Sequence, residues 1–388
     1  MMRTPFRAAA AAAGLVAAAA VAAFAVTVHI ARLVVTPPAT HEYDIRVRGR
    51  DDAHGSVTLS RTPDTILPGR YGVWFGQDTG YLRVADVLRR GPDTVTRALE
   101  RLDFGVPHTQ AQARWSGYYF LSPEELDLPV RSIEIPGPLG QLPAWLFPAD
   151  EPRADGGWVV VVHGRGAQRQ EGLRAVPVLH ELGYSVLLVS YRNDGDAPDS
   201  PDGRYGLGGT EWHDVEAAIG FAMTHGARSI VLMGWSMGGA IVLQALTRSA
   251  HRAAIRAVVL DSPVVDWVDT LEFQAALLRV PPLLAAFAMR MLGSRWGALL
   301  TGQDAPVDLP SMDFVARSAE LSVPILILHS DDDGYVPATG SRRLAELRPD
   351  IVTLVSFTRA RHTRLWNYDA GRWNAAIRDW VGTRPSRR

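Results

Sequence analysis

The chain has 388 residues, 47% of them hydrophobic and 21% charged, and its formal net charge is −1. This length allows one large domain with appendages, or two domains. The near-zero charge argues against a nucleic-acid-binding protein, since such proteins usually carry a basic surplus. All 40 basic residues are arginines, so chemistry that needs a lysine, such as a Schiff base, is excluded. The chain also has no cysteine, which excludes disulfides, thiol catalysis and cysteine-ligated metal sites.

The N-terminal segment is apolar and carries no charge from Ala8 to Val28. About 20 apolar residues are enough to span a bilayer as a helix. Arg3 and Arg7 precede the segment, which by the positive-inside rule leaves the N-terminus in the cytoplasm. We therefore predict a single-pass anchor within residues 1–35 that contacts membrane lipid and holds an extracytoplasmic catalytic domain at the cell membrane.

Two other interpretations of this segment stay open. Arg32 lies on its far side, which weakens the predicted orientation. Residues 23–25 (Ala-Phe-Ala) have the small-residue pattern of a signal-peptidase site, and cleavage there predicts a secreted protein. The richness in alanine also fits a long low-complexity helix with no membrane role.

Residues 36–130 are predicted to form a small, mostly β N-terminal domain. Residues 44–48 and 56–60 alternate polar and apolar side chains, as half-buried strands do. Val95 to Leu102 has the pattern of a short helix. Nothing in this region has the form of a catalytic motif.

From residue 131 to residue 388 the pattern changes to short apolar runs that alternate with amphipathic stretches. Continuous apolar runs are typical of strands buried on both faces of a parallel sheet. The runs lie at residues 158–162, 185–189, 230–233, 257–260, 325–328 and 352–355. The stretches with helical spacing lie at residues 172–182, 211–224, 238–248, 341–347 and 371–381. This alternation predicts an α/β domain with a doubly wound, mostly parallel sheet, whose ligands bind at the carboxyl ends of the strands.

One interval interrupts the alternation, because no clear strand lies between Leu260 and Val323. The stretches 267–278 and 283–292 have the pattern of apolar helices. We predict a helical lid insertion over residues 262–312, with leucines such as Leu277 and Leu283 lining an acyl pocket. The alternative is a set of additional core helices.

A candidate nucleophile follows the run that ends at Met233. Residues 234–238 read Gly-Trp-Ser-Met-Gly, and an amphipathic stretch comes next. This is the Gly-x-Ser-x-Gly elbow in the strand–turn–helix context that it needs. Side chains at Gly234 or Gly238 would collide with neighbouring backbone, so the glycines permit a strained turn that exposes Ser236 at the sheet edge.

A serine nucleophile needs a base, an acid that orients the base, and donors for the oxyanion. His362 follows the last apolar run and is the predicted base, whereas His329 and His163, which also end strands, are not. The acid is predicted in the cluster 331–333, which follows the preceding run. The oxyanion donors are predicted to be the N–H of Met237 and that of Arg165, with Gly164 as the alternative to Arg165.

These blocks resemble the α/β-hydrolase superfamily, and the resemblance covers roughly two thirds of the chain. Gly-Trp-Ser-Met-Gly-Gly is similar to the serine aminopeptidase, prolyl-oligopeptidase-like and dienelactone-hydrolase-like branches. The segment 329–337 resembles the family's His-Gly-x-x-Asp-x-x-Val-Pro block, with Ser330 in place of glycine, and in that pattern the acid is Asp333. Asp261, which follows the preceding strand, is the rival acid. The anchor and the extra domain together resemble membrane-anchored bacterial hydrolases.

The resulting hypothesis is a membrane-anchored serine hydrolase that cleaves a carboxylic ester by way of an acyl-enzyme on Ser236. It needs no organic cofactor, metal or nucleic acid, and its partner is a small acyl-ester or peptide substrate. The alternatives are a peptidase of the serine aminopeptidase or prolyl-oligopeptidase type, and a catalytically silent hydrolase-like binding protein. The acid-rich stretch 193–203 lacks the EF-hand calcium spacing and is predicted to be a solvated loop.

Overall fold

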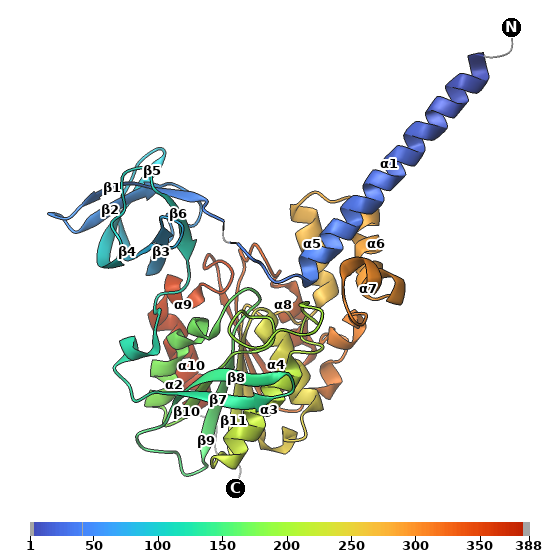
Figure 1. Ribbon diagram of the computed structural model, residues 1–388. Helices are drawn as coiled ribbons and strands as arrows, with labels where there is room; N and C mark the ends of the chain where they lie inside the picture. Colours follow the sequence, from blue (N-terminus) through green and yellow to red (C-terminus); the bar gives the residue numbers. More distant parts are fainter. Residues whose placement is uncertain (1–3, 41, 383–388) are drawn as a thin grey trace.

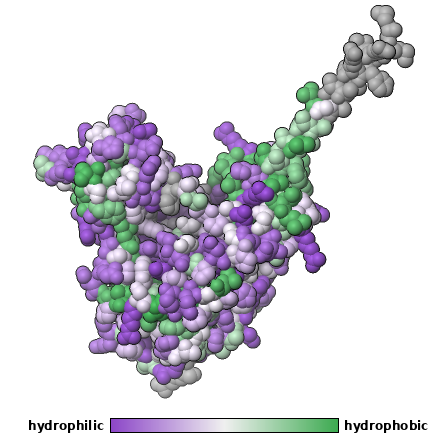
Figure 2. All heavy atoms as spheres, in the orientation of Figure 1, coloured by the Kyte–Doolittle hydropathy of each residue, from purple (hydrophilic) through white to green (hydrophobic). Residues whose placement is uncertain are grey.

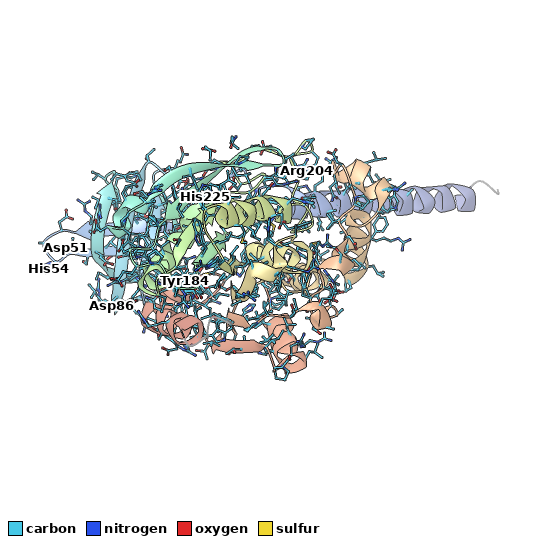
Figure 3. The ribbon with its side chains drawn as sticks, turned by 90° about the horizontal axis from the view of Figure 1, so that it is seen from below. Asp51, His54, Asp86, Tyr184, Arg204 and His225 are labelled. Atoms are coloured by element: carbon cyan, nitrogen blue, oxygen red, sulfur yellow. The ribbon has the colours of Figure 1, made fainter. Side chains whose placement is uncertain are left out.

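The computed structural model describes residues 4–40 and 42–382. Three parts are visible in Figure 1: a long N-terminal helix, a small β-barrel, and an α/β domain with a central sheet. In the view from below, the barrel and the helix lie at opposite ends of the molecule, with Asp51 and His54 at the outer tip of the barrel (Figure 3). Arg3 and the predicted end of the catalytic domain after residue 382 lie outside the described residues.

Helix α1 (Thr4–Val35) contains the predicted apolar segment. Residues Ala17–Val35 form a stretch long and apolar enough to cross a membrane, by length and composition. The C-terminal part of the helix packs on the rest of the molecule, where Thr27, Ala31 and Val35 are fully buried. The helix ends at the breaker pair Pro37-Pro38, because proline cannot continue the backbone hydrogen bonding.

The next six strands close into a barrel in the order β1-β2-β5-β4-β3-β6. Their bounds are Ile45–Asp51, Ser56–Ser60, Tyr71–Phe75, Gly80–Arg90, Thr94–Phe104 and Gln112–Ser116 for β1 to β6. This confirms the β-rich N-terminal domain. The predicted helix Val95–Leu102 is wrong, because these residues lie in strand β5. Up to Ala98 the side chains alternate between buried and partly exposed positions, and pairing with β2 and β4 outweighs a weak local helical pattern.

The α/β domain is built on an eight-stranded sheet in the order β14-β13-β12-β11-β9-β10-β8-β7. The bounds of β7 to β14 are Arg131–Gly137, Gly140–Phe147, Gly157–Val162, Ser185–Val189, Ser229–Trp235, Ile255–Asp261, Ile325–Ser330 and Val352–Phe357. The six strands from β9 onward run parallel, whereas β7 and β8 form an antiparallel edge. The predicted mostly parallel sheet is confirmed.

Helices cover both faces of this sheet because successive side chains of the parallel strands point to opposite faces and both sets are buried. Val160 and Val162 belong to the buried cluster that includes residues of α3 (Trp212–Thr224), α4 (Met237–Arg248) and α8 (Thr339–Leu347). Val159 and Val161 belong to the cluster on the other face, which includes residues of α2 (Val176–Glu181), α9 (Leu365–Tyr368) and α10 (Ala370–Gly382).

The insertion after β12 is helical, as predicted. It contains α5 (Trp267–Leu277), α6 (Pro282–Leu292) and a further helix, α7 (Arg295–Thr301). Asp266 caps α5 by accepting hydrogen bonds from the first-turn N–H groups, and Ser294 caps α7 in the same way. Helices α6 and α7 pack against the end of α1, and Figure 1 shows the three helices together at one corner of the molecule.

Candidate active site

Ser236 lies in the turn between β11 and α4, at the carboxyl edge of the sheet. Its φ of 50° and ψ of −118° place a non-glycine residue in a sparsely populated region, which costs about 1–3 kcal/mol. The neighbouring glycines permit the turn. A Cβ at Gly238 would lie 2.4 Å from the carbonyl oxygen of Val162, and one at Gly234 would lie 2.4 Å from that of Gly238. Helix α4 therefore begins directly against β9, and Ser236 sits at their junction.

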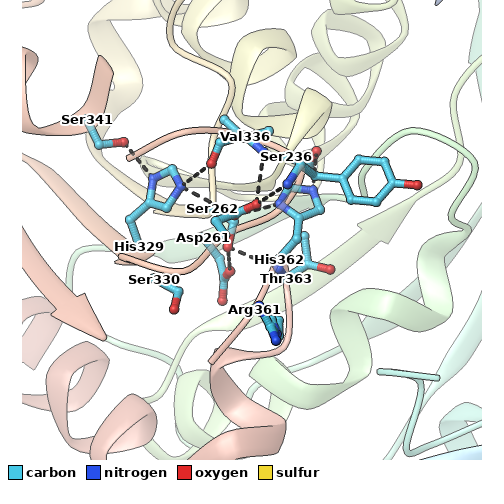
Figure 4. A network of polar contacts seen from close by, with 12 residues as sticks. Ser236, Asp261, Ser262, His329, Ser330, Val336, Ser341, Arg361, His362 and Thr363 are labelled. Carbon is cyan, nitrogen blue, oxygen red and sulfur yellow. Dashed lines mark hydrogen bonds and ion pairs between the residues drawn. The ribbon is translucent and has the colours of Figure 1, made fainter. Parts of the chain in front are cut away.

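Ser236, His362 and Asp333 are joined by hydrogen bonds, and Figure 4 shows Ser236 and His362 within the network of polar contacts around them. Ser236 Oγ lies 2.9 Å from His362 Nε2, and His362 Nδ1 lies 2.7 Å from Asp333 Oδ2. The three residues follow β11, β14 and β13, so loops at one edge of the sheet bring together positions far apart in the sequence. The imidazole is 18% exposed, whereas the carboxylate is buried. In this order the imidazole can take the hydroxyl proton while the carboxylate orients the ring and stabilises its charged form, which is suited to activating a serine.

Asp333 is held in place by more than His362. Its Oδ1 accepts hydrogen bonds from the N–H groups of Tyr335, at 2.8 Å, and Val336, at 2.9 Å. Its Oδ2 lies 3.4 Å from His329 Nε2. Burial by itself raises the pKa of Asp333, but the charge and hydrogen bonds of His362 and His329 lower this pKa well below its usual range. The carboxylate therefore stays ionised.

The pKa of His362 is raised above the ordinary histidine value. Burial alone lowers it, but the charge and hydrogen bond of Asp333 outweigh burial, and the charges of Glu171 and Asp261 add to the effect. The imidazole is therefore a stronger base than a free histidine. This suits proton transfer from a serine hydroxyl.

The other carboxylates near the histidine have different partners. Asp331 pairs with Arg342, and Asp332 accepts hydrogen bonds from Ser330 Oγ and from the N–H of Arg361. Ser330, which replaces the family's glycine, thus ties two loops together. Asp261, the rival acid, is buried and accepts from Trp373 Nε1 at 2.8 Å and from the hydroxyl of Ser262 at 2.9 Å. Its burial raises its pKa.

The two predicted oxyanion donors lie on adjoining segments. Met237 is the first residue of α4, and the first N–H groups of a helix have no partner inside it. The N–H of Gly164 is occupied, since it donates to Glu171 Oε2 at 2.7 Å. The N–H of Arg165 has no acceptor among the described residues. Gly164 packs against the nucleophile, because a Cβ there would lie 3.2 Å from the Cβ of Ser236.

Sequence reasoning missed two residues that support the site. Asp194 was predicted to lie in a solvated loop, but it is buried and its Oδ2 lies 3.0 Å from His163 Nε2. It follows β10, so the rule that chemistry-bearing residues come just after strands applies to it as well. His329 was set aside as a base. Its spacing of four residues from Asp333 is the signal that points to its contact with that carboxylate.

A cavity of about 1110 Å³ opens beside His362. The barrel forms one wall with Trp74, Arg114 and Trp115, and the α/β domain forms the other with residues such as Tyr335. The wall carries both acidic and basic side chains, so the cavity suits a polar group. The barrel, in which the sequence showed no catalytic motif, therefore contributes to the site.

The insertion does not line this cavity, since no residue of α5, α6 or α7 contributes to its wall. Leu277 and Leu283, expected in an acyl pocket, are exposed on the surface. Helix α5 meets the site only at its margin, where Gln274 Nε2 donates to the carbonyl oxygen of Tyr335. Helices α6 and α7 pack on α1, and α5 packs on α6, which leaves these leucines outside. A lid role stays a prediction.

The fold and these contacts agree with comparisons to known proteins. A sequence profile described as "Alpha/beta hydrolase family" matches residues 159–376, and the chain belongs to this family. It is a hydrolase of the α/β type. A second profile, "Domain of unknown function (DUF8805)", matches residues 46–116, which is the barrel.

One human relative, Protein ABHD12B, is 26% identical over 197 residues. The match covers 49% of this chain and 49% of the relative, so the chain spans about half the length of the curated relative that it matches.

Two solved structures share the fold. The Pyrococcus furiosus esterase Pf2001 has a TM-score of 0.51 and 18% identity, over 68% of this chain and 94% of that one. Est1E from Butyrivibrio proteoclasticus, solved with ferulic acid bound, has a TM-score of 0.50 and 16% identity, over 64% and 98% of the two chains.

Proposed function

We propose that this protein is a serine hydrolase that cleaves a carboxylic ester, with Ser236 as nucleophile, His362 as base and Asp333 as the acid that orients the base. The observation that carries the proposal is the pair of hydrogen bonds that link the three side chains, at 2.9 Å and 2.7 Å. The esterase fold of one similar solved structure supports the class of bond.

The reaction proceeds in two steps. His362 Nε2 takes the proton of Ser236 as Oγ attacks the ester carbonyl, and the imidazolium is stabilised by Asp333. The N–H groups of Met237 and Arg165 donate to the oxyanion, which is the usual source of much of the rate enhancement. The imidazolium then protonates the leaving alkoxide, and an acyl-enzyme remains on Ser236. In the second step His362 takes a proton from a water that attacks the acyl carbonyl, and the imidazolium then returns this proton to Ser236 Oγ as the carboxylic acid leaves.

The substrate binds in the cavity between the barrel and the α/β domain, with a polar portion facing the charged wall. Helix α1 anchors the enzyme as a single membrane span, and the catalytic domain lies on the extracytoplasmic side. The long apolar helix supports the span, and Arg7, which precedes the uncharged stretch, supports the side.

A panel of p-nitrophenyl esters of increasing chain length, assayed beside aminoacyl p-nitroanilides, tests this function. Wild-type protein should hydrolyse the esters, and Ser236→Ala should lose this activity while its circular dichroism spectrum stays unchanged. Hydrolysis of the anilides with the esters left intact would favour the peptidase alternative. Equal ester turnover by wild type and Ser236→Ala would overturn the proposal.

A further inference from the structure

The insertion exposes large apolar side chains where α5 meets α6 and along α7. Leu283 is 84% exposed and Leu299 is 83% exposed. Leu278 and Trp296 are exposed as well. Contiguous exposed apolar surface on a soluble domain is unusual and marks a site of contact.

This surface is continuous with helix α1. The ring of Phe24 on α1 lies 6.3 Å from that of Phe287 on α6, and the ring of Phe287 lies 5.7 Å from that of Trp296 on α7. Arg32 Nε also donates to the carbonyl oxygen of Leu300 at 2.7 Å. Figure 2 shows hydrophobic surface along the lower part of α1 and over the helices around it.

The length of α1 relates this surface to a membrane. From Ala8 to Val28, the stretch without charge, the helix rises about 30 Å at about 1.5 Å per residue. The hydrocarbon core of a bilayer is about 30 Å thick. If this stretch spans the core, Phe24 lies four residues, or about 6 Å, from its end, so α6 and α7, which pack beside it, reach the boundary between headgroups and acyl chains.

The charge of the insertion also suits a lipid surface. Between Glu272 and Asp304 the charged residues are Arg279, Arg290 and Arg295, with no acidic residue among them. All three are exposed. Exposed arginines beside leucines and a tryptophan are typical of helices that lie in the interface of an anionic membrane.

We propose that the exposed face of α5–α7 (Leu278, Leu283, Trp296 and Leu299, with the three arginines) is a second membrane contact. The leucines enter the acyl region around the base of α1, and the arginines bind lipid phosphates. A bilayer is the occupant because α1 leaves the domain at this face, so any membrane that holds α1 meets the face directly. The proposal rests on the proposed span and is independent of the chemistry at Ser236. Its consequence is that two contacts hold the domain in one orientation to the membrane.

The absence of native cysteine makes a direct test practical. Leu283→Cys and Leu299→Cys are each spin-labelled in the full chain, in vesicles of phosphatidylcholine and phosphatidylglycerol. Collision with oxygen, which concentrates in lipid, is compared with collision with a water-soluble nickel chelate. Matched controls are Leu88→Cys in the barrel, 57% exposed, and Leu347→Cys at the end of α8, 54% exposed.

Labels at positions 283 and 299 should collide more with oxygen than with nickel, and the two controls should do the reverse. Greater access to nickel at positions 283 and 299 would overturn the proposal. Low access to both reagents would overturn it in favour of contact with a second copy of the chain. A label on Val21→Cys reports the span itself, and greater nickel access there would remove the premise.

The role of the arginines has its own measurement. With all three replaced by glutamine, the labels at positions 283 and 299 should become more accessible to nickel in phosphatidylglycerol vesicles and change less in pure phosphatidylcholine. If the ratio of oxygen collision to nickel collision stays unchanged in both lipids, the arginines do not bind the lipid phosphates. All measurements are repeated in the Ser236→Ala variant, so the result does not depend on the proposed ester hydrolysis.

Discussion

Two loops at the carboxyl edge of the sheet each carry a histidine paired with a buried aspartate. In the first loop (residues 163–166, after β9) His163 pairs with Asp194 at 3.0 Å. In the second loop (residues 361–364, after β14) His362 pairs with Asp333 at 2.7 Å. The difference lies in the other ring nitrogen. His163 Nδ1 faces the carbonyl oxygen of Gly164 at 2.9 Å, whereas His362 Nε2 faces the hydroxyl of Ser236. The histidine–aspartate pair of the first loop therefore holds the loop in place. In the second loop the histidine of the pair is the proposed base.

The two loops are also held from opposite sides by parts outside the sheet. Arg165 of the first loop donates through Nη2 to the carbonyl oxygens of Leu33, at 2.6 Å, and Thr36, at 2.7 Å, at the end of α1. Asp64 of the barrel segment pairs with Arg361, at 3.1 Å, and Arg364, at 2.7 Å, of the second loop. Helix α1 and the barrel are thus connected to different loops of the proposed catalytic site.

The largest loss of kcat is expected from Asp333→Asn, which changes the His362–Asp333 pair and leaves the His163–Asp194 pair intact. The neutral amide no longer stabilises the imidazolium, and kcat for a p-nitrophenyl ester should fall by about 10³–10⁴-fold. Asp331→Asn, in the same loop, should stay close to wild type because its partner is the exposed Arg342. A larger loss for Asp261→Asn than for Asp333→Asn would move the acid to the preceding strand.

The pH profile sharpens the comparison. His362 accepts a proton only when neutral, so kcat/KM should be lost as the pH falls through its pKa, which lies above the ordinary value. Asp333→Asn removes the main cause of that elevation and leaves burial, which lowers the pKa. In Asp333→Asn the fall of the remaining kcat/KM with decreasing pH should therefore occur at lower pH than in wild type. Asp194→Asn should leave this fall at the wild-type pH, and an equal shift in both variants would contradict the assignment.

A smaller effect is expected from Arg165→Ala, which keeps the backbone N–H but releases the end of α1. Hydrogen bonds to a charged group contribute about 1.5–3 kcal/mol, part of which positions the loop, so kcat should fall by about tenfold. Arg204→Ala is the matched control, since Arg204 Nη1 donates to Thr36 Oγ1 at 2.9 Å but carries no proposed oxyanion donor. Arg204 is labelled in Figure 3. Equal losses in both variants would show that only the anchoring of this segment matters.

The smallest effect is expected from Asp64→Asn. Its ion pairs to Arg361 and Arg364 are partly exposed, and such pairs contribute about 0–1 kcal/mol. The variant should lower kcat by less than about fivefold. A loss as large as that of Asp333→Asn would mean that the barrel controls the position of His362 far more strongly than the contacts indicate.

Much of the α/β domain was predictable because its signals are contiguous in sequence. Buried parallel strands appear as unbroken apolar runs, and the elbow around Ser236 needs its glycines within five residues. The barrel strand β5 was predicted wrongly because its stability comes from pairing with β2 and β4, which no local window contains.

The surroundings of the site could not be predicted because they are formed by contacts between segments far apart in the sequence. The pairing of Asp194 with His163 and the barrel wall at Trp74 and Arg114 are of this kind. The exposed leucines of the insertion have the same cause. The apolar pattern of its helices carried no information that α6 and α7 would pack on α1.

The proposed mechanism depends on Ser236 being a nucleophile that His362 activates. The most direct test treats the full chain with a fluorophosphonate and identifies the modified residue by mass spectrometry. We expect one adduct, on Ser236, that forms rapidly in wild type, slowly in Asp333→Asn, and not at all in Ser236→Ala. A folded wild-type protein that stays unlabelled, or that carries the adduct on another residue, would contradict it.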